Sequence, residues 1–203
     1  MPLRLGVLAS TNATDMQAVI DEIKKGGLDS QISVVIANKA CGALEKAKQH
    51  NIHSALIPST GVKERETYDR LVDAELAKHH VELVLLIGYM RYLSPWFVSK
   101  WKNRTMNIHP SLLPAFGGGM DLDVHQAVLD AGVKVTGATL HFVDEGADTG
   151  PIILQKAVPV VEGETSESLK RKVQAAEQEI ILQGIRLFAE GRLHLEGRIV
   201  HVR

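Results

Sequence analysis

Three residues of the sequence have side chains that could together catalyse acyl transfer. Asn107 and His109 stand two positions apart at the start of Asn107–Pro114, and Asp148 follows His109 by 39 positions (148 − 109). If Thr105–Ile108 ends a β-strand, the amide and the imidazole point to the same side, because side chains alternate along a strand. An amide can stabilise an oxyanion, an imidazole can transfer protons, and a carboxylate can orient the ring. We therefore expect these three residues to form a catalytic group.

The segments around these residues indicate how they are positioned. Pro110 and Pro114 favour an extended loop after His109, since proline fixes its own φ and restricts the residue before it. Asp148 lies in a second turn, the Gly-rich segment 141-HFVDEGADTGPII-153. An opposite charge raises the pKa of a histidine, so Asp148 beside His109 is expected to favour the imidazolium. His109 could then donate a hydrogen bond to the oxyanion or carry a proton between two nitrogens.

The remaining histidines and the single cysteine have weaker functional interpretations. His141 lies in an alternating strand pattern and is expected to be structural, whereas His125 could contact substrate or cap a helix at the surface. The sequence holds no histidine or acidic motif with metal-ligand spacing, so we expect no metal. Cys41 is the only cysteine, which excludes an intramolecular disulfide and fits a reducing compartment.

Composition and charge set limits on the class of protein. The 203 residues, 45% of them apolar and 23% charged, suit one domain with a substantial core. A net charge of −1 gives no basic field that would attract nucleic acid or a membrane surface. The start of the chain does not resemble a signal peptide, and no apolar run approaches the roughly 18 residues of a membrane span. We expect a cytoplasmic protein that binds small molecules and neither nucleic acid nor membrane.

The order of the expected elements indicates the fold class. Strands alternate with helices in the first half of the chain, which is typical of a parallel sheet with crossover helices. The strands are expected at Leu3–Leu8, Ile32–Ala37, His53–Ile57, Leu83–Ile87 and Thr105–Ile108. The helices are expected at about Asp15–Lys25, Leu44–Gln49 and Glu66–Lys78, from the cap Ser94-Pro95 onward, and at Val124–Ala131.

After Val135 the pattern changes to long strands and one long helix. Val135–Val143 and Ile152–Val161 are expected to form an antiparallel addition to the sheet, and His194–Val202 a small hairpin. Thr165 or Ser166 can cap a final helix that runs through Leu187. The sequence therefore predicts an α/β, Rossmann-like fold with a mostly parallel sheet, helices on both faces, and partly antiparallel C-terminal strands.

Six segments distributed over nearly the whole chain form a wider pattern. They are 3-LRLGVLAS-10, 36-IANKA-40, 85-LLIGYMRYLSP-95, 106-MNIHPSLLP-114, 136-TGATLHFVDEGADTGPIILQ-155 and 172-KVQAAEQEI-180. In their order and in their amino-acid sequences they resemble the folate-dependent formyltransferases, most closely those that act on glycinamide ribonucleotide in purine synthesis. The resemblance implies formyl transfer from 10-formyltetrahydrofolate, as co-substrate, to a primary amine, with Asn107, His109 and Asp148 as catalytic residues. We expect one domain over 1–203, with a nucleotide-binding-like half (1–108) and a folate-binding and catalytic half (109–203), as a monomer or homodimer.

The same resemblance assigns folate contacts to two segments and one further residue. These residues are Arg65, Tyr89, Met90, Arg91, Tyr92, Leu93, Asp144, Glu145, Gly146 and Ala147. Met90 and Leu93 suit a flat aromatic ligand, whereas Arg91 could reach the anionic tail or the other substrate. Because three consecutive glycines have a large ordering cost, the loop Gly117–Asp121 is expected to order when substrate binds.

The resemblance also implies where the phosphate and ribose of the substrate bind. The residues are Thr11, Asn12, Ala13, Thr14 and Asp15, with Glu177 for the ribose. Relatives have a Gly-rich turn here that binds phosphate at a helix N-terminus, but Thr11 and Ala13 replace the two glycines. Asp15 stands where asparagine is common. Either a cation such as Lys63 or Arg65 offsets this carboxylate, or Asp15 selects an uncharged or cationic amine.

Other functions of the same scaffold remain as alternatives. The acceptor could be another small amine, such as an amino-sugar nucleotide, or the chain could be a formyltetrahydrofolate hydrolase. A methionyl-tRNA formyltransferase is not expected, since the sequence has no basic C-terminal nucleic-acid module. A hydrolase of the usual type would carry an N-terminal regulatory domain, and a non-catalytic folate or nucleotide binder would not need the three catalytic side chains.

Overall fold

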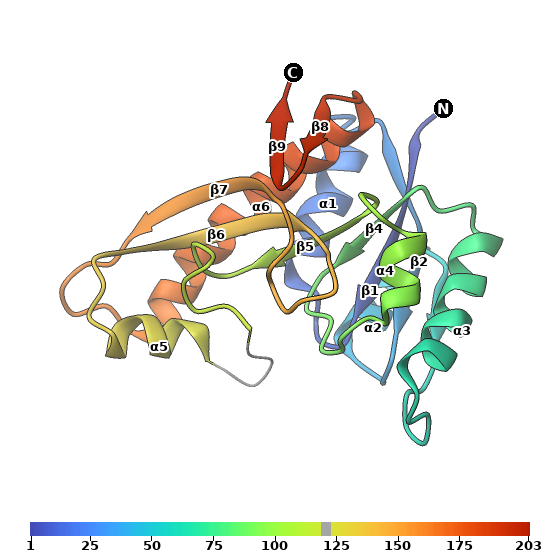
Figure 1. Cartoon of the computed structure of the whole chain (residues 1–203), viewed down its shortest axis with the longest axis horizontal. Coiled ribbons are helices and arrows are strands. Elements are labelled where there is room, and N and C mark those ends of the chain that lie inside the picture. Colours follow the sequence, from blue (N-terminus) through green and yellow to red (C-terminus); the bar gives the residue numbers. More distant parts are fainter. Residues whose placement is uncertain (119–122) are drawn as a thin grey trace. The chain divides into compact units, whose positions relative to one another are not determined.

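The computed structural model describes residues 1–118 and 123–203, and the chain divides into two compact units, Met1–Met106 and Asn107–Arg203 (Figure 1). The boundary expected from the sequence lay two residues later, between 108 and 109. Asn107 and His109 therefore belong to the same unit. The loop expected over Gly117–Asp121 lies in part outside the described residues, which resume at Asp123.

Parallel strands joined by helices make up the first unit. Strand β1 (Leu3–Ala9) pairs in parallel with β2 (Ser30–Ala37) and with β4 (Leu83–Leu86), and β2 pairs in parallel with β3 (Ser54–Leu56). The helices are α1 (Thr14–Lys24), α2 (Gly42–Gln49), α3 (Arg65–Lys78) and α4 (Pro95–Lys100). Helix α1 packs against α2, and α3 packs against α4 (Figure 1). The elements expected for this half are confirmed, with ends that differ by one or two residues.

Burial explains why these strands are continuous apolar runs. The strand residues Leu5, Val7, Val35 and Leu85 are completely buried. A parallel strand covered on both faces has no solvent side, so it lacks the polar–apolar alternation of an exposed sheet. The apolar runs therefore form the core of the first unit and hold the turns that follow each strand.

The second unit contains the antiparallel strands and the long helix. Strand β5 (Thr105–His109) crosses into it, and β6 (Val135–Phe142) pairs antiparallel with β7 (Ile152–Pro159). Helix α5 (Val124–Asp130) packs against α6 (Ser166–Ala189), and α6 lies along β6 and β7 (Figure 1). Strands β8 (Leu193–Glu196) and β9 (Ile199–Val202) form a separate hairpin. The larger sheet has the strand order β3-β2-β1-β4-β5-β6-β7, which confirms the predicted fold class.

Side-chain caps determine where several helices begin. The Thr165 hydroxyl accepts a hydrogen bond from the Ser168 N–H (3.1 Å), and the Ser168 hydroxyl accepts one from the Thr165 N–H (3.0 Å). The Ser94 hydroxyl likewise accepts from the Phe97 N–H (3.2 Å), with Pro95 as the first helical residue. Both predicted caps are confirmed. Within the described residues, no helix is long and apolar enough to span a membrane.

Candidate active site

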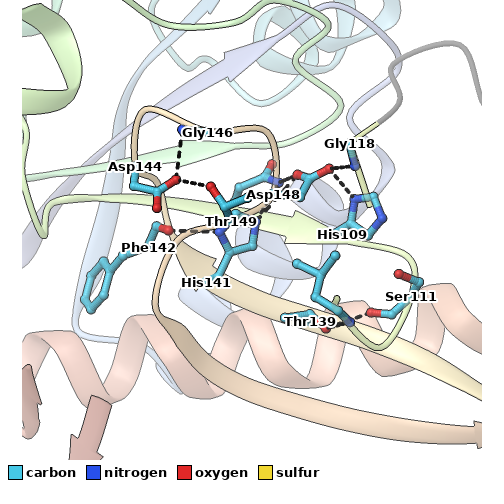
Figure 2. A network of polar contacts seen from close by, with 12 residues as sticks. His109, Ser111, Gly118, Thr139, His141, Phe142, Asp144, Gly146, Asp148 and Thr149 are labelled. Carbon is cyan, nitrogen blue, oxygen red and sulfur yellow. Dashed lines mark hydrogen bonds and ion pairs between the residues drawn. The ribbon is translucent and has the colours of Figure 1, made fainter. Parts of the chain in front are cut away.

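The three predicted catalytic residues meet in the second unit. Asn107 and His109 lie on β5, and Asp148 lies in the loop between β6 and β7. The Asn107 amide nitrogen is 3.2 Å from Asp148 Oδ1. His109 Nδ1 is 3.4 Å from Asp148 Oδ2 (Figure 2). The structure thus brings together a buried imidazole, an amide and a carboxylate from segments about 40 residues apart.

His141, which the sequence assigned to a structural role, joins this group. Its Nε2 atom is 3.1 Å from the Asn107 amide nitrogen and 3.7 Å from Asp148 Oδ1. Its Nδ1 atom is 2.8 Å from the carbonyl oxygen of Phe142, which can only accept a hydrogen bond. Nδ1 therefore carries the proton, and Nε2 accepts one from Asn107. Its place in an alternating strand pattern was the only sequence signal for this residue, and that pattern did not indicate which side chains would surround it.

Asn107 is held more firmly than the sequence interpretation assumed. An amide nitrogen has two N–H bonds, and here one is directed at His141 and the other at Asp148. An amide that donates to an oxyanion must therefore release or share one of these hydrogen bonds. The two partners fix the orientation of the side chain, because they distinguish the amide nitrogen from the amide oxygen.

The loop that carries Asp148 is shaped by its own polar contacts. Asp148 adopts a left-handed backbone conformation (φ 54), and its Oδ2 atom accepts a hydrogen bond from the Gly118 N–H at 3.0 Å. Asp144 Oδ1 accepts from the Gly146 N–H (3.1 Å) and the Thr149 hydroxyl (2.6 Å), as Figure 2 shows. These contacts close the loop on itself and direct the Asp148 carboxylate toward the two imidazole rings.

A buried polar network holds the loop that follows His109. The Thr139 hydroxyl donates to the Ser111 carbonyl (2.7 Å) and accepts from the Leu113 N–H (3.0 Å). Gln155, on β7, donates to the carbonyl oxygen of Leu113 at 3.0 Å. Strands β6 and β7 therefore fix this loop by satisfying its backbone groups, which a proline-rich segment cannot pair within itself.

The protonation state of His109 differs from the prediction. Burial lowers the pKa of His109, and this effect together with nearby His141 outweighs the raising effects of Asp148 and the Phe116 carbonyl. The Phe116 oxygen is 3.0 Å from His109 Nε2, so the neutral ring carries its proton there and presents its Nδ1 lone pair toward Asp148. Asp148 acts in the predicted direction, but the desolvation of the charged form is larger and makes the net shift of the His109 pKa a lowering.

Asp148 is ionised throughout the physiological range. Burial acts to raise its pKa, but the contact with His141, the Gly118 N–H and the electrostatic effects of the two nearby histidines together lower the pKa of Asp148 to about 2. A neutral imidazole beside a permanent carboxylate can take up a proton during a reaction, since the product is a close ion pair. The group therefore has the properties of a general base with a built-in counter-charge.

Gly150 gives a direct test of how tightly the Asp148 loop is held. A Cβ added at this buried glycine would overlap the backbone carbonyl of Phe142, the same carbonyl that faces His141. We predict that Gly150→Ala lowers the free energy of unfolding by about 1–3 kcal/mol, as overpacking does, and reduces activity. Urea denaturation measures the change, with Gly27→Ala as control, where an added Cβ at this exposed glycine would meet only the flexible Glu22 side chain. Equal destabilisation by the two substitutions would contradict this tight fit.

Two turns meet at the carboxyl ends of β1 and β4 in the first unit. The Ser10 N–H donates to the carbonyl oxygen of Gly88 (2.9 Å), and the Ser10 hydroxyl accepts from the Met90 N–H (2.8 Å). In the sheet, β1 lies between β2 and β4. The chain builds the sheet outward on one side of β1 with β2 and β3, and then on the other side from β4 onward, so the strand order reverses between β1 and β4. Open α/β sheets bind ligands at such a point. The predicted phosphate and folate segments of this unit are therefore linked.

The segment after β4 presents some of its predicted folate residues and buries others. Met90 and Tyr92 are about half exposed, whereas Leu93 is buried in the core. The Arg91 guanidinium stacks 4.2 Å from the ring centre of Tyr68. Of the two residues expected to suit a flat aromatic ligand, Met90 is therefore accessible and Leu93 is packed in the core. The Arg91 side chain therefore packs within the first unit.

Buried polar groups lie beneath this segment. Burial raises the pKa of Tyr89 well above its usual range, and it raises the pKa of Asp69, which accepts a hydrogen bond from the Ser94 N–H at 2.6 Å. Arg65, at the start of α3, donates to the carbonyl oxygen of Leu93 at 3.4 Å. The contacts of Asp69 and Arg65 therefore hold the backbone at the end of this segment, at Leu93 and Ser94.

The turn after β1 has an unusual helix start. Ala13, at the N-cap position of α1, adopts a left-handed conformation (φ 43, ψ 62), and among the described side chains none caps this helix. The Lys46 ammonium, from α2, donates to the carbonyl oxygen of Ala13 at 3.0 Å. Burial lowers the pKa of Lys46, while nearby Asp15 and Asp21 act to raise it. Lys46, which the sequence analysis did not consider, is thus a cation in electrostatic contact with Asp15.

The remaining residues predicted to bind phosphate, ribose or folate lie in several different segments. Asn12 belongs to the turn before α1, Thr14 is the first residue of that helix, and the Thr11 hydroxyl accepts weakly from the Ala13 N–H at 3.4 Å. Glu177 lies half-buried on α6, and Glu145 lies exposed in the Asp148 loop. In the described part of the chain, no group of three or more histidine, cysteine or acidic residues is placed to hold a metal ion.

Comparisons with known proteins agree on one family. The family model described as "Formyl transferase" matches residues 3–185. The chain is 38% identical over 194 residues to phosphoribosylglycinamide formyltransferase of Escherichia coli (strain K12), which covers 95% of this chain and 90% of that protein. A crystal structure of glycinamide ribonucleotide transformylase 1 from Symbiobacterium toebii superposes with a TM-score of 0.94 at 42% identity, covering 99% of this chain and 94% of that chain.

Longer relatives match the same region. The trifunctional purine biosynthetic protein adenosine-3 of Bos taurus is 43% identical over 202 residues, which cover 98% of this chain and 20% of that protein. The chain therefore spans a fifth or less of the length of these trifunctional relatives.

Proposed function

Because the chain belongs to the formyl transferase family, we propose that it transfers the formyl group of 10-formyltetrahydrofolate to the primary amine of glycinamide ribonucleotide in purine synthesis. The observation that carries this proposal is the cluster in the second unit, where a buried neutral His109 and the Asn107 amide both contact the ionised Asp148. These are the groups that attack by an amine on an amide carbonyl requires. We further propose that the protein acts in the cytoplasm as a monomer or homodimer.

In the proposed reaction, the acceptor amine attacks the formyl carbon and a tetrahedral intermediate forms. Asn107 turns one of its N–H bonds from its protein partner to the oxyanion, which stabilises the developing charge. His109 accepts the proton that the attacking nitrogen loses, and Asp148 stabilises the resulting imidazolium. The bond from the formyl carbon to N10 of the folate then breaks, and N10 receives the proton. The products are the N-formylated ribonucleotide and tetrahydrofolate.

For the substrate phosphate, we propose the turn 11–15 in the first unit. A helix N-terminus attracts anions through its first N–H groups and its dipole, and the start of α1 has no cap among the described side chains. Lys46 adds a positive charge at the Ala13 carbonyl. For the ribose we propose Glu177. For the folate we propose the accessible Met90 and Tyr92 of the first unit, the backbone of 88–93, and the loop 144–147 of the second unit.

The acceptor is tested by competition among amines. Purified protein is incubated with 10-formyltetrahydrofolate and, separately, glycinamide ribonucleotide, its unphosphorylated riboside, an amino-sugar nucleotide and no acceptor. We expect kcat/KM for the ribonucleotide to exceed that for the riboside by at least about tenfold, since a phosphate at a helix N-terminus contributes charged hydrogen bonds. A preference for the amino-sugar nucleotide, or formate release that acceptors leave unchanged, would assign the chain to one of the alternative functions.

Asp15 gives a prediction about the phosphate turn. Since Lys46 offsets its charge, we predict that Asp15→Asn changes the KM for the ribonucleotide by no more than about threefold, the scale of a screened charge pair. Lys46→Met should raise that KM more strongly, because it leaves the Asp15 carboxylate opposed to phosphate. Steady-state kinetics at saturating folate measure both values. A much larger loss for Asp15→Asn than for Lys46→Met would mean that Asp15 itself binds the substrate.

A further inference from the structure

The hairpin formed by β8 and β9 touches the loop that carries Asp148. Its two strands pair from Leu193↔Val202 to Glu196↔Ile199, so Gly197 and Arg198 form the turn. The hairpin lies beyond residues 3–185, the part matched by the family model. Its base is joined to α6, since the Arg192 N–H donates to the carbonyl of Leu187 at 3.0 Å, and β9 also packs against β7.

Arg198, at the tip of this hairpin, makes two contacts with the Asp148 loop. Its Nη2 atom donates to the backbone carbonyl of Thr149, and its Nη1 atom is 3.8 Å from Asp144 Oδ2. Thr149 is the residue directly after Asp148, and Asp144 is the carboxylate that organises the loop through the Gly146 N–H and the Thr149 hydroxyl. Arg198 therefore holds both ends of the segment 144–149.

From these contacts we infer that Arg198 is a positioning residue, through which the C-terminal hairpin clamps the loop 144–149 in the conformation that presents Asp148 to His109. The inference rests on the proposed function for its effect on formylfolate. The ion pair with Asp144 is weak by itself, since the Arg198 side chain is 70% exposed. The hydrogen bond to a main-chain carbonyl is the stronger contact, and it acts where the left-handed backbone of Asp148 needs support.

The clamp affects the two substrates differently. Because Asp144–Ala147 are proposed folate contacts, a loosened loop weakens the interaction with formylfolate, whereas the phosphate turn 11–15 is unaffected. A shifted Asp148 also lowers turnover through His109. We expect Arg198→Met to reduce kcat/KM for formylfolate about three- to tenfold, the scale of a partly exposed charged hydrogen bond, with the KM for the ribonucleotide unchanged. Arg198→Lys keeps one donor and should recover part of the loss.

Arg203 provides a matched control within the same hairpin. It pairs with Glu196 at 3.2 Å, and its backbone N–H and carbonyl oxygen form hydrogen bonds with Arg192 at the base of the hairpin. Arg203→Met removes an equally exposed guanidinium from the hairpin without removing a contact to the Asp148 loop. We expect this variant to match the wild-type protein in kcat/KM for both substrates.

Hydrogen exchange of the substrate-free protein tests the clamp independently of activity. In Arg198→Met, amides of the segment 144–149 should exchange faster than in the wild type, while Arg203→Met should leave them unchanged. A chain that does not formylate the ribonucleotide but shows this exchange pattern would refute the proposed function and leave the clamp in place. Unchanged exchange in Arg198→Met, or equal effects of the two substitutions, would overturn the clamp.

Discussion

His109→Ala and Asn107→Ala should each reduce kcat by at least about 10²-fold, with little change in the KM for formylfolate. His109 supplies the base, and Asn107 supplies the donor for the oxyanion, so both act on the transition state rather than on the bound substrates. His109 Nδ1 lies 3.4 Å from the ionised Asp148 carboxylate, so the imidazolium that forms on protonation is stabilised as an ion pair.

Steady-state kinetics with both substrates measure these effects. His201→Ala is a suitable control, because His201 is exposed on β9 and contacts Glu196 at 3.6 Å. It should retain the kcat of the wild-type protein. A His109 or Asn107 variant that keeps a near-wild-type kcat would remove that residue from the mechanism.

Asp148→Asn should lower kcat by about 10- to 10²-fold while the fold is retained, since an amide keeps the shape but loses the counter-charge for the imidazolium. The Asp148 charge raises the pKa of His109, so its removal lowers that pKa further below the ordinary value. The reactive form of His109 is neutral. The acid limb of the pH–rate profile should therefore move to lower pH in the variant, although the maximal rate falls.

NMR titration of the His109 ring provides the matching measurement. The wild-type protein should show a His109 pKa below that of an unperturbed histidine, and Asp148→Asn should show a still lower one. An equal or higher pKa in the variant would mean that Asp148 does not act on His109 through its charge.

Local patterns in the sequence predicted the fold well. Strands β1, β2 and β4 are mainly apolar runs of four to eight residues. The caps at Ser94 and Thr165 are signals that lie within a few residues of the helix they start. Asn107 and His109 could be identified because they share one strand. Asp148 could be proposed from its acidic side chain in a Gly-rich turn and from the resemblance to a family, since no spacing rule links it to β5.

Features that depend on contacts between distant segments could not be predicted. His141 reaches Asn107 across 34 positions, and Lys46 reaches the Ala13 carbonyl across 33. Arg198 meets Thr149 across 49 positions. The direction of the His109 pKa shift was missed for the same reason, because burial depends on the whole packed unit whereas the charge of Asp148 was visible in the sequence. Arg91 could be placed in its segment, but not on the ring of Tyr68.

The central claim is that this cluster transfers a formyl group to the amine of a phosphorylated substrate. Its most direct test follows a ¹³C-labelled formyl group from 10-formyltetrahydrofolate by NMR, in a single turnover with glycinamide ribonucleotide. The wild-type protein should place the label in the N-formyl amide of the ribonucleotide, and His109→Ala should leave it on the folate over the same period. Label that appears as formate, or that reaches the ribonucleotide equally fast in His109→Ala, would contradict the account.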